Sequence, residues 1–166
     1  MISLQNAIRA VVAVAVLAVA LPASAAPEGK NATARSSKRP ATSEKQHRLI
    51  IQVNSNEPAM MNLALNNATN VTQYYKELGE KVSVQIVTFG PGLHMLREDT
   101  SPVKARIETL ALSTPEISYK ACGNTQENMR KAENKDIPII SQAKIVKSGV
   151  VTVMELQEQG WSYVKP

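Results

Sequence analysis

Short apolar runs that alternate with longer amphipathic stretches constrain the fold of this chain more than any other feature. The runs are rich in Val and Ile, which is typical of strands, and they cover residues 49–53, 81–89, 117–121, 143–146 and 161–164. The stretches between them carry apolar residues at steps of three or four, as in helices packed on one side, and cover 58–78, 102–111, 125–133 and 149–159, with a short helical turn around His94. This alternation predicts an α/β fold: a single doubly wound, mainly parallel five-stranded sheet with helices on both faces.

The N-terminal residues have the pattern of a secretory signal. Arg9 is followed by an apolar stretch over residues 10–21 and then by small residues that include Ala23 and Ala25. We expect residues 1–25 to be a signal peptide that is cleaved near Ala25, so that the mature protein is exported to the periplasm and is not held in the membrane. An uncleaved membrane anchor is the alternative.

Residues 26–47 differ from the rest of the chain in composition. They have almost no large apolar side chain, and residues 27–48 hold six Lys or Arg against two Glu. We interpret 26–47 as a disordered basic linker, and 48–166 as one folded domain. Because residues 49–166 contain twelve basic and twelve acidic side chains, the domain has no charge pattern for binding nucleic acid.

Cys122 is the single cysteine and lies where the third expected strand gives way to a helix. An exported chain with one cysteine cannot form an internal disulfide, so this thiol is shielded, reactive, or paired with another molecule. The free N–H groups and the positive dipole end of the following helix would favour a thiolate, in a site that we expect to be partly open. Free cysteine is also among the most buried residue types, so a packing role is the alternative.

The other candidate residues follow the expected strands. In open α/β sheets, ligands bind beyond the carboxyl ends of the strands. At those ends stand Asn54, Gly90, Gly92, His94, Cys122, Gly123, Asn124, Thr125 and the segment 147–149. Small and polar residues allow a ligand to approach the backbone, although turn formation alone would select the same residue types.

Familiar catalytic patterns are missing from the sequence. There is no phosphate-binding glycine loop, no dinucleotide-binding fingerprint and no pair of His at metal-ligand spacing, so we expect neither a metal nor a cofactor. His94 could act as a base for Cys122 in a hydrolase, but the sequence offers no acid to orient it.

Two segments carry a resemblance to a known family. Ala-Cys-Gly-Asn-Thr, which ends at Thr125, and the ending that runs from Ile-Val-Lys-Ser-Gly149 to Ser-Tyr-Val164 resemble the DsrE/DsrF-like family over about residues 48–166. The resemblance implies a small doubly wound fold, homo- or hetero-oligomers, and a cysteine at position 122 that carries sulfur as a persulfide between a donor and an acceptor protein.

The resemblance and the strand ends together suggest one arrangement of the site. Cys122 would be the sulfur acceptor, the N–H groups of Gly123, Asn124 and Thr125 would stabilise the sulfur anion, and Asn54 would shape the pocket together with the 90–92 loop. The alternative is a non-catalytic oligomeric binding module in which Cys122 is a buried structural residue.

Overall fold

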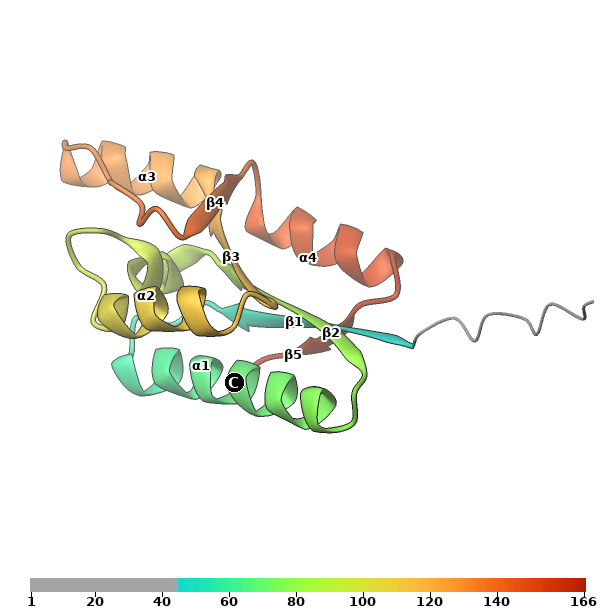
Figure 1. The fold of residues 1–166 in the computed structure, drawn as a ribbon. Coiled ribbons are helices and arrows are strands. Elements are labelled where there is room, and N and C mark those ends of the chain that lie inside the picture. The colour runs from blue at the N-terminus through green and yellow to red at the C-terminus, as the bar shows by residue number, and fades with distance from the viewer. Residues whose placement is uncertain (1–44) are drawn as a thin grey trace, which may run out of the picture. The chain divides into compact units, whose positions relative to one another are not determined.

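The structure is a computed structural model that describes residues 45–166, shown in Figure 1. The predicted signal peptide and almost all of the predicted linker lie outside these residues. The elements follow in the order β1 (Gln46–Val53), α1 (Pro58–Glu77), β2 (Lys81–Thr88), η1 (Gly90–Leu96), α2 (Lys104–Ser113), β3 (Ile117–Cys122), α3 (Gly123–Glu133), β4 (Ala143–Val146), α4 (Gly149–Glu158) and β5 (Ser162–Val164).

All strand pairs in the sheet are parallel, and the strand order is β4-β3-β2-β1-β5. The first three crossovers therefore move along the sheet in one direction, and the last returns past β1 to its other side. Since such crossovers are right-handed, this reversal places helices on both faces of the sheet. The predicted doubly wound α/β fold with five strands is confirmed.

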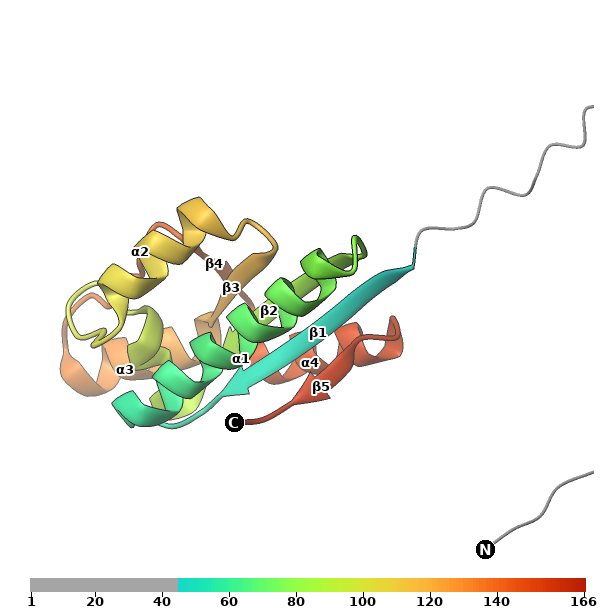
Figure 2. The same ribbon diagram turned by 60° about the horizontal axis from the view of Figure 1, so that its bottom comes forward.

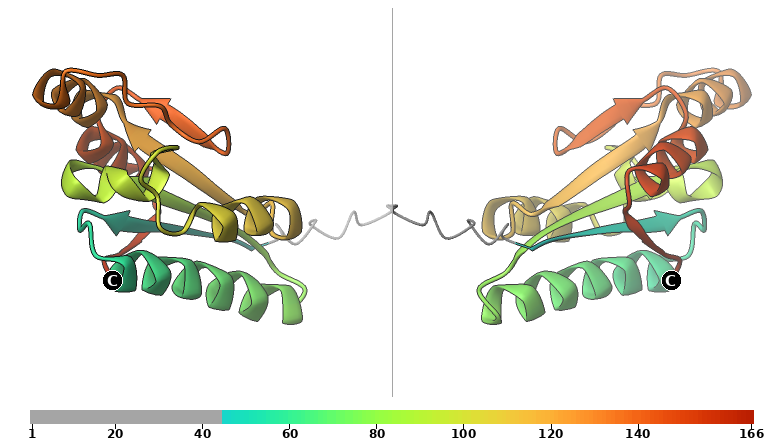
Figure 3. Two further views of the ribbon diagram at one scale, coloured as in Figure 1. Left: turned by 90° about the vertical axis from the view of Figure 1, so that its left-hand side faces the viewer. Right: turned by 90° about the vertical axis from the view of Figure 1, so that its right-hand side faces the viewer.

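The two faces are covered unequally. One face, with Leu49, Ile51 and Ile86, packs against α1, η1 and α2, and Met129 of α3 joins the same core. The other face holds a smaller core in which Ile50 and Val87 meet α4 and Trp161. Figures 1 and 2 show α1 and α4 on opposite sides of the strands, and Figure 3, right, shows β4 extending beyond α4. The central strands are thus buried on both faces, while β4 lies at an edge.

Some boundaries differ from the prediction. The first strand begins at Gln46 rather than at residue 49, because Gln46 and His47 continue the pairing with β2, so the domain starts before the expected residue 48. The Ser101 hydroxyl donates to the carbonyl of Met95 at 2.6 Å and accepts from the Val103 N–H at 3.4 Å, and α2 starts at Lys104 with Val103 as its N-cap.

The orientation of α4 also corrects the sequence analysis. The helical pattern places Val150, Val153 and Met154 on its inner side. The structure buries Val153 together with Leu156, whereas the side chains of Val150 and Met154 are exposed.

Among residues 45–166, no helix has the length and apolar character needed to cross a membrane.

Candidate functional site

Cys122 stands at the junction of a strand and a helix. It is the last residue of β3 and the N-cap of α3, with an extended backbone (φ −72°, ψ 114°). The helix begins at Gly123, two residues earlier than predicted, so its first free N–H groups lie directly beside the thiol.

A second helix also begins at this thiol. Gly149 is the first residue of α4, and a Cβ built on it would lie 3.2 Å from the Cβ of Cys122 and 2.9 Å from Cδ1 of Phe89. No side chain larger than hydrogen fits there without a shift of the Phe89 ring. The N-termini of α3 and α4 therefore meet at one sulfur atom, which places the positive ends of two helices beside it.

The surroundings of the thiol act on its pKa in two directions. Burial raises the pKa of Cys122, whereas hydrogen bonds from the Thr125 hydroxyl and from the backbone N–H groups of Gly149, Thr125 and Asn124 lower it. The net result is a pKa below the ordinary value of a cysteine. Because these donors stabilise the anion, the site favours a thiolate over a thiol.

Thr125 links the thiol to the loop after β2. The backbone N–H of Gly90 donates to the Thr125 hydroxyl oxygen at 3.0 Å, and the same hydroxyl lowers the pKa of the thiol. The expected glycine loop therefore contributes through Gly90, which has a φ of +54° that side chains rarely adopt.

Gly123 has a different position from the one expected. Its N–H is not among the groups that lower the pKa of the thiol. The N–H of Gly149, which belongs to α4 and not to α3, is one of those groups. A Cβ on Gly123 would lie 3.1 Å from the carbonyl oxygen of Val146, so this glycine allows α3 to start close against β4. The Asn124 N–H also donates to the carbonyl of Lys147 at 3.2 Å, so it is shared between two acceptors.

The thiol is less accessible than expected. Cys122 is only 4% exposed, so the expectation of a partly open site is wrong. The covering groups include Gly149 and Phe89 on the side of α4. A reactant must therefore be small, or the β4–α4 connection must move to admit it.

Asn54 and Gly92 lie at the end of β1. A Cβ on Gly92 would collide with the carbonyl of Val53, so this glycine packs the η1 turn onto that strand. Asn54 lines a pocket with Lys165 and Pro166. Because β1 is two strands away from β3, Asn54 stands about 10 Å along the sheet from the cysteine strand.

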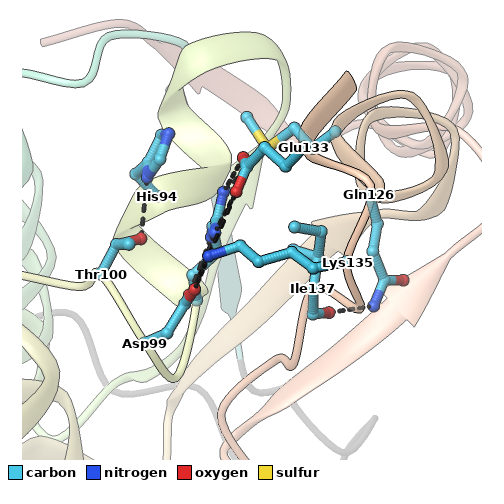
Figure 4. A network of polar contacts seen from close by, with 9 residues as sticks. His94, Asp99, Thr100, Gln126, Glu133, Lys135 and Ile137 are labelled. Carbon is cyan, nitrogen blue, oxygen red and sulfur yellow. Dashed lines mark hydrogen bonds and ion pairs between the residues drawn. The ribbon is translucent and has the colours of Figure 1, made fainter. Parts of the chain in front are cut away.

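His94 lies in η1, as predicted, but it does not serve the cysteine. Its Nδ1 is hydrogen-bonded to the Thr100 hydroxyl at 2.8 Å, as Figure 4 shows. No hydrogen bond joins His94 to Cys122 within residues 45–166. In the described part of the chain, His94 is therefore not positioned as a base for Cys122.

A buried arginine next to this region was missed by the sequence analysis. Arg97 is fully buried and bonds to both carboxylate oxygens of Asp99 (2.9 and 2.8 Å) and of Glu133 (2.5 and 2.9 Å). Lys135 contacts the same two carboxylates, and the network is visible in Figure 4. It joins the end of η1 to the end of α3. An arginine that directly follows the apolar pair Met95-Leu96 was the available signal.

No group of His, Cys, Asp and Glu side chains in residues 45–166 could hold a metal ion.

Comparison with known proteins supports the fold. No family model matches the chain, and no curated protein matches it. A solved structure of a protein of unknown function, MTH1491 from Methanobacterium thermoautotrophicum, is similar with a TM-score of 0.60 and 23% identity, over 72% of this chain and 99% of that chain. Fold and site together define a doubly wound α/β protein with one cysteine buried where two helices begin.

Proposed function

We propose that this chain is an exported, periplasmic sulfur-handling protein, similar to the DsrE/DsrF-like family, in which Cys122 accepts a sulfur atom. The observation that supports the proposal most is the meeting of two helix N-termini at one thiol, with N–H donors from Gly149, Thr125 and Asn124. Such donors stabilise an anion on sulfur, either the attacking thiolate or the persulfide that it forms.

The proposed step transfers a sulfane sulfur without net oxidation of the protein and donor together. The Cys122 thiolate attacks the outer sulfur of a donor persulfide, R–S–SH. A new S–S bond forms on Cys122, the S–S bond of the donor breaks, and its electron pair leaves with the thiolate R–S⁻. The proton stays on the transferred sulfur until it ionises, and the same donors then face the persulfide anion.

One observation favours the second candidate function. Cys122 is buried, as expected for a packing residue in a non-catalytic oligomeric binding module. A lowered pKa and two helix N-termini beside the thiol would, however, have no role in a packing residue. The persulfide acceptor therefore accounts for more of the geometry.

The test is persulfide formation on native protein. Treatment with a persulfide or polysulfide donor should add about 32 Da, the mass of one sulfur atom, and a reductant should remove it. The Cys122→Ser variant should show no increase. Absence of the added mass from native protein, together with its appearance after unfolding, would favour the binding module.

Export and assembly are further parts of the proposal. The signal pattern at residues 1–25 supports export, and the intact mass of secreted material would show whether the protein begins near Ala26.

The resemblance implies a homo- or hetero-oligomer, and the exposed apolar side chains of Val150, Val151 and Met154 on α4 fit a covered surface. Light scattering of the purified protein tests the assembly, and a monomer would argue against it.

A further inference from the structure

Two lysines stand opposite each other on the face of the sheet that carries the cysteine. Lys120 of β3 is paired in register with Lys144 of β4, and Cys122 is paired in the same way with Val146. Since side chains alternate between faces along a strand, Lys120 and Lys144 point to the same face as Cys122. Lys120 precedes Cys122 by two residues, which is about 7 Å along the strand.

The two lysines carry like charges that act on each other. Within the described part of the chain, no carboxylate is within ion-pair distance of Lys120 or Lys144. Like charges directly opposite each other on neighbouring strands destabilise a sheet. Burial lowers the pKa of Lys120, and the positive charge of Lys144 lowers it further. An anion held between the two ammonium groups would remove this repulsion.

The pair lies on the less covered side of the molecule. Of the helices in residues 45–166, α4 alone packs on this face, and β4 extends beyond it in Figure 3, right. Lys120 is half-buried and Lys144 is exposed at the edge of the sheet. An anion can therefore reach the pair from solvent and lie next to the strand that ends at the thiol.

We propose that Lys120 and Lys144 form a binding site for a small dianionic sulfane-sulfur compound, of the class of inorganic polysulfide or thiosulfate, which donates its sulfur to Cys122. This proposal rests on the proposed function of Cys122. The donor is a small ion rather than a protein-bound persulfide because Cys122 is 4% exposed, and a compact ion needs much less opening than a protein-borne sulfur. Two positive charges on the face of the sheet that carries the thiol would also offset the repulsion between a thiolate and a dianion.

The step balances for a tetrasulfide dianion. The Cys122 thiolate attacks a terminal sulfur, one S–S bond forms on the protein, and one S–S bond of the donor breaks. A trisulfide dianion leaves with the electron pair. The total charge is unchanged, and no further oxidant or reductant is needed.

Two alkylating reagents of different charge provide the test. Iodoacetate is an anion and iodoacetamide is neutral, and both react only with the thiolate. The ratio of their rate constants at Cys122 therefore cancels any change in the pKa of the thiol and reports the local potential. We would measure it for the native protein, for Lys120→Gln/Lys144→Gln and for the single variant Lys144→Gln, which changes only an exposed side chain and keeps the test open if the double variant does not fold.

The control removes the same charge at the other end of the sheet. Lys45 directly precedes β1, and Lys76 is in the last turn of α1, so both lie away from the carboxyl end where Cys122 stands. The double variant Lys45→Gln/Lys76→Gln should leave the reagent ratio unchanged. A drop equal to that of the lysine-pair variant would show a net-charge effect and overturn the site.

For the lysine pair we expect the iodoacetate-to-iodoacetamide ratio to fall about threefold or more at low salt, with a smaller fall for Lys144→Gln alone. The difference should shrink in 0.5 M salt, where charges are screened within a few ångströms. Addition of sulfur from sodium tetrasulfide should slow by a larger factor, because the donor is a dianion. An unchanged reagent ratio overturns the site, and an unchanged tetrasulfide rate overturns its role in sulfur donation.

The two proposals fail in different ways. If iodoacetamide does not label Cys122 in the folded protein, the sulfur-acceptor function fails, and the donor site falls with it. If iodoacetamide and tetrasulfide react with Cys122 at rates independent of the lysines, the function stands and the donor site alone is wrong.

Discussion

The backbone N–H of Gly90 donates a hydrogen bond of 3.0 Å to the hydroxyl oxygen of Thr125. The same Thr125 hydroxyl lowers the pKa of Cys122, so the loop after β2 contacts a residue that acts on the thiol at the end of β3. The bond joins two segments that lie 35 residues apart in the sequence and that the folded sheet brings together.

Removal of the Thr125 hydroxyl should raise the pKa of Cys122. Thr125→Val keeps the shape of the side chain but leaves the Gly90 N–H without its acceptor and the sulfur without its side-chain donor. We expect slower alkylation at neutral pH and a loss of about 1 kcal/mol in the free energy of unfolding. Thr125→Ser retains the hydroxyl and serves as the control, with an alkylation profile near that of the native protein. An unchanged profile for Thr125→Val would show that the hydroxyl does not act on the sulfur.

A methyl group at Gly149 should disturb the thiol site from the side of α4. Gly149→Ala places a Cβ 2.9 Å from the Phe89 ring, so the ring or the helix must move. We expect a destabilisation of about 1–3 kcal/mol by chemical denaturation and a changed rate of Cys122 labelling. The variant Glu155→Ala on the same helix changes an exposed polar side chain and should stay within about 0.5 kcal/mol. Equal effects of the two variants would argue against close contact at Gly149.

The Arg97 network should make stability depend on acid pH. The hydrogen bonds from Arg97 lower the pKa of Glu133 to about 2 and hold the pKa of Asp99 well below its usual range. A carboxylate with a lowered pKa in the folded state contributes stability that is complete above its unfolded pKa, about 4.3 for Glu, and is lost as the pH falls toward 2.

Denaturant unfolding between pH 6 and pH 2.5 measures this dependence. Glu133→Gln should flatten the dependence of the free energy of unfolding on pH. In the native chain, Glu133 binds a proton more readily in the unfolded state than in the folded state, and the variant removes this difference. Glu155→Gln, on the outer side of α4, is the matched control and should leave the curve unchanged. A curve with the native slope in Glu133→Gln would mean that the Arg97 ion pair does not form in solution.

The N-terminal boundary of the domain can be tested by truncation. His47 Nε2 lies 2.5 Å from Glu80 Oε2, and the His47 ring stacks on Tyr75 at 3.6 Å between centroids. A chain that begins at Lys45 should keep the full free energy of unfolding, because residues 27–44 have too little apolar surface to offset their ordering entropy. A chain that begins at Leu49 should lose about 1 kcal/mol or more. Marked destabilisation of the longer chain would show that the preceding residues dock on the domain.

The fold was predictable because its signals are local and repeated. The runs that contain Ile51, Val84 and Tyr119 alternate or are continuously apolar, and each is followed by a helical pattern, so the order of elements alone leads to a parallel sheet. Helix starts were less predictable. Ser101 has the residue type of an N-cap, yet α2 starts at Lys104, and the Ser101 hydroxyl donates to the carbonyl of Met95, a contact that depends on the packing of η1.

The site was predicted only in part, for a related reason. The sequence places Cys122 beside the helix that follows it, and hence beside Asn124 and Thr125. The contact with Gly149 depends on the rotation of α4 over the sheet, which no local pattern specifies. The burial of Arg97 likewise depends on two carboxylates that lie 2 and 36 residues away along the chain.

The rate of iodoacetamide labelling of Cys122 as a function of pH tests the central claim most directly. The native protein should be labelled near neutral pH, with a midpoint below the value of about 8.5 for an unperturbed cysteine. The same chain in denaturant should show the unperturbed midpoint. The contrary result is a thiol that resists labelling until the protein unfolds, together with a destabilisation of about 1–3 kcal/mol in Cys122→Ser, as for a hydroxyl placed in an apolar site. That result would identify Cys122 as a packing residue and contradict its role as a sulfur acceptor.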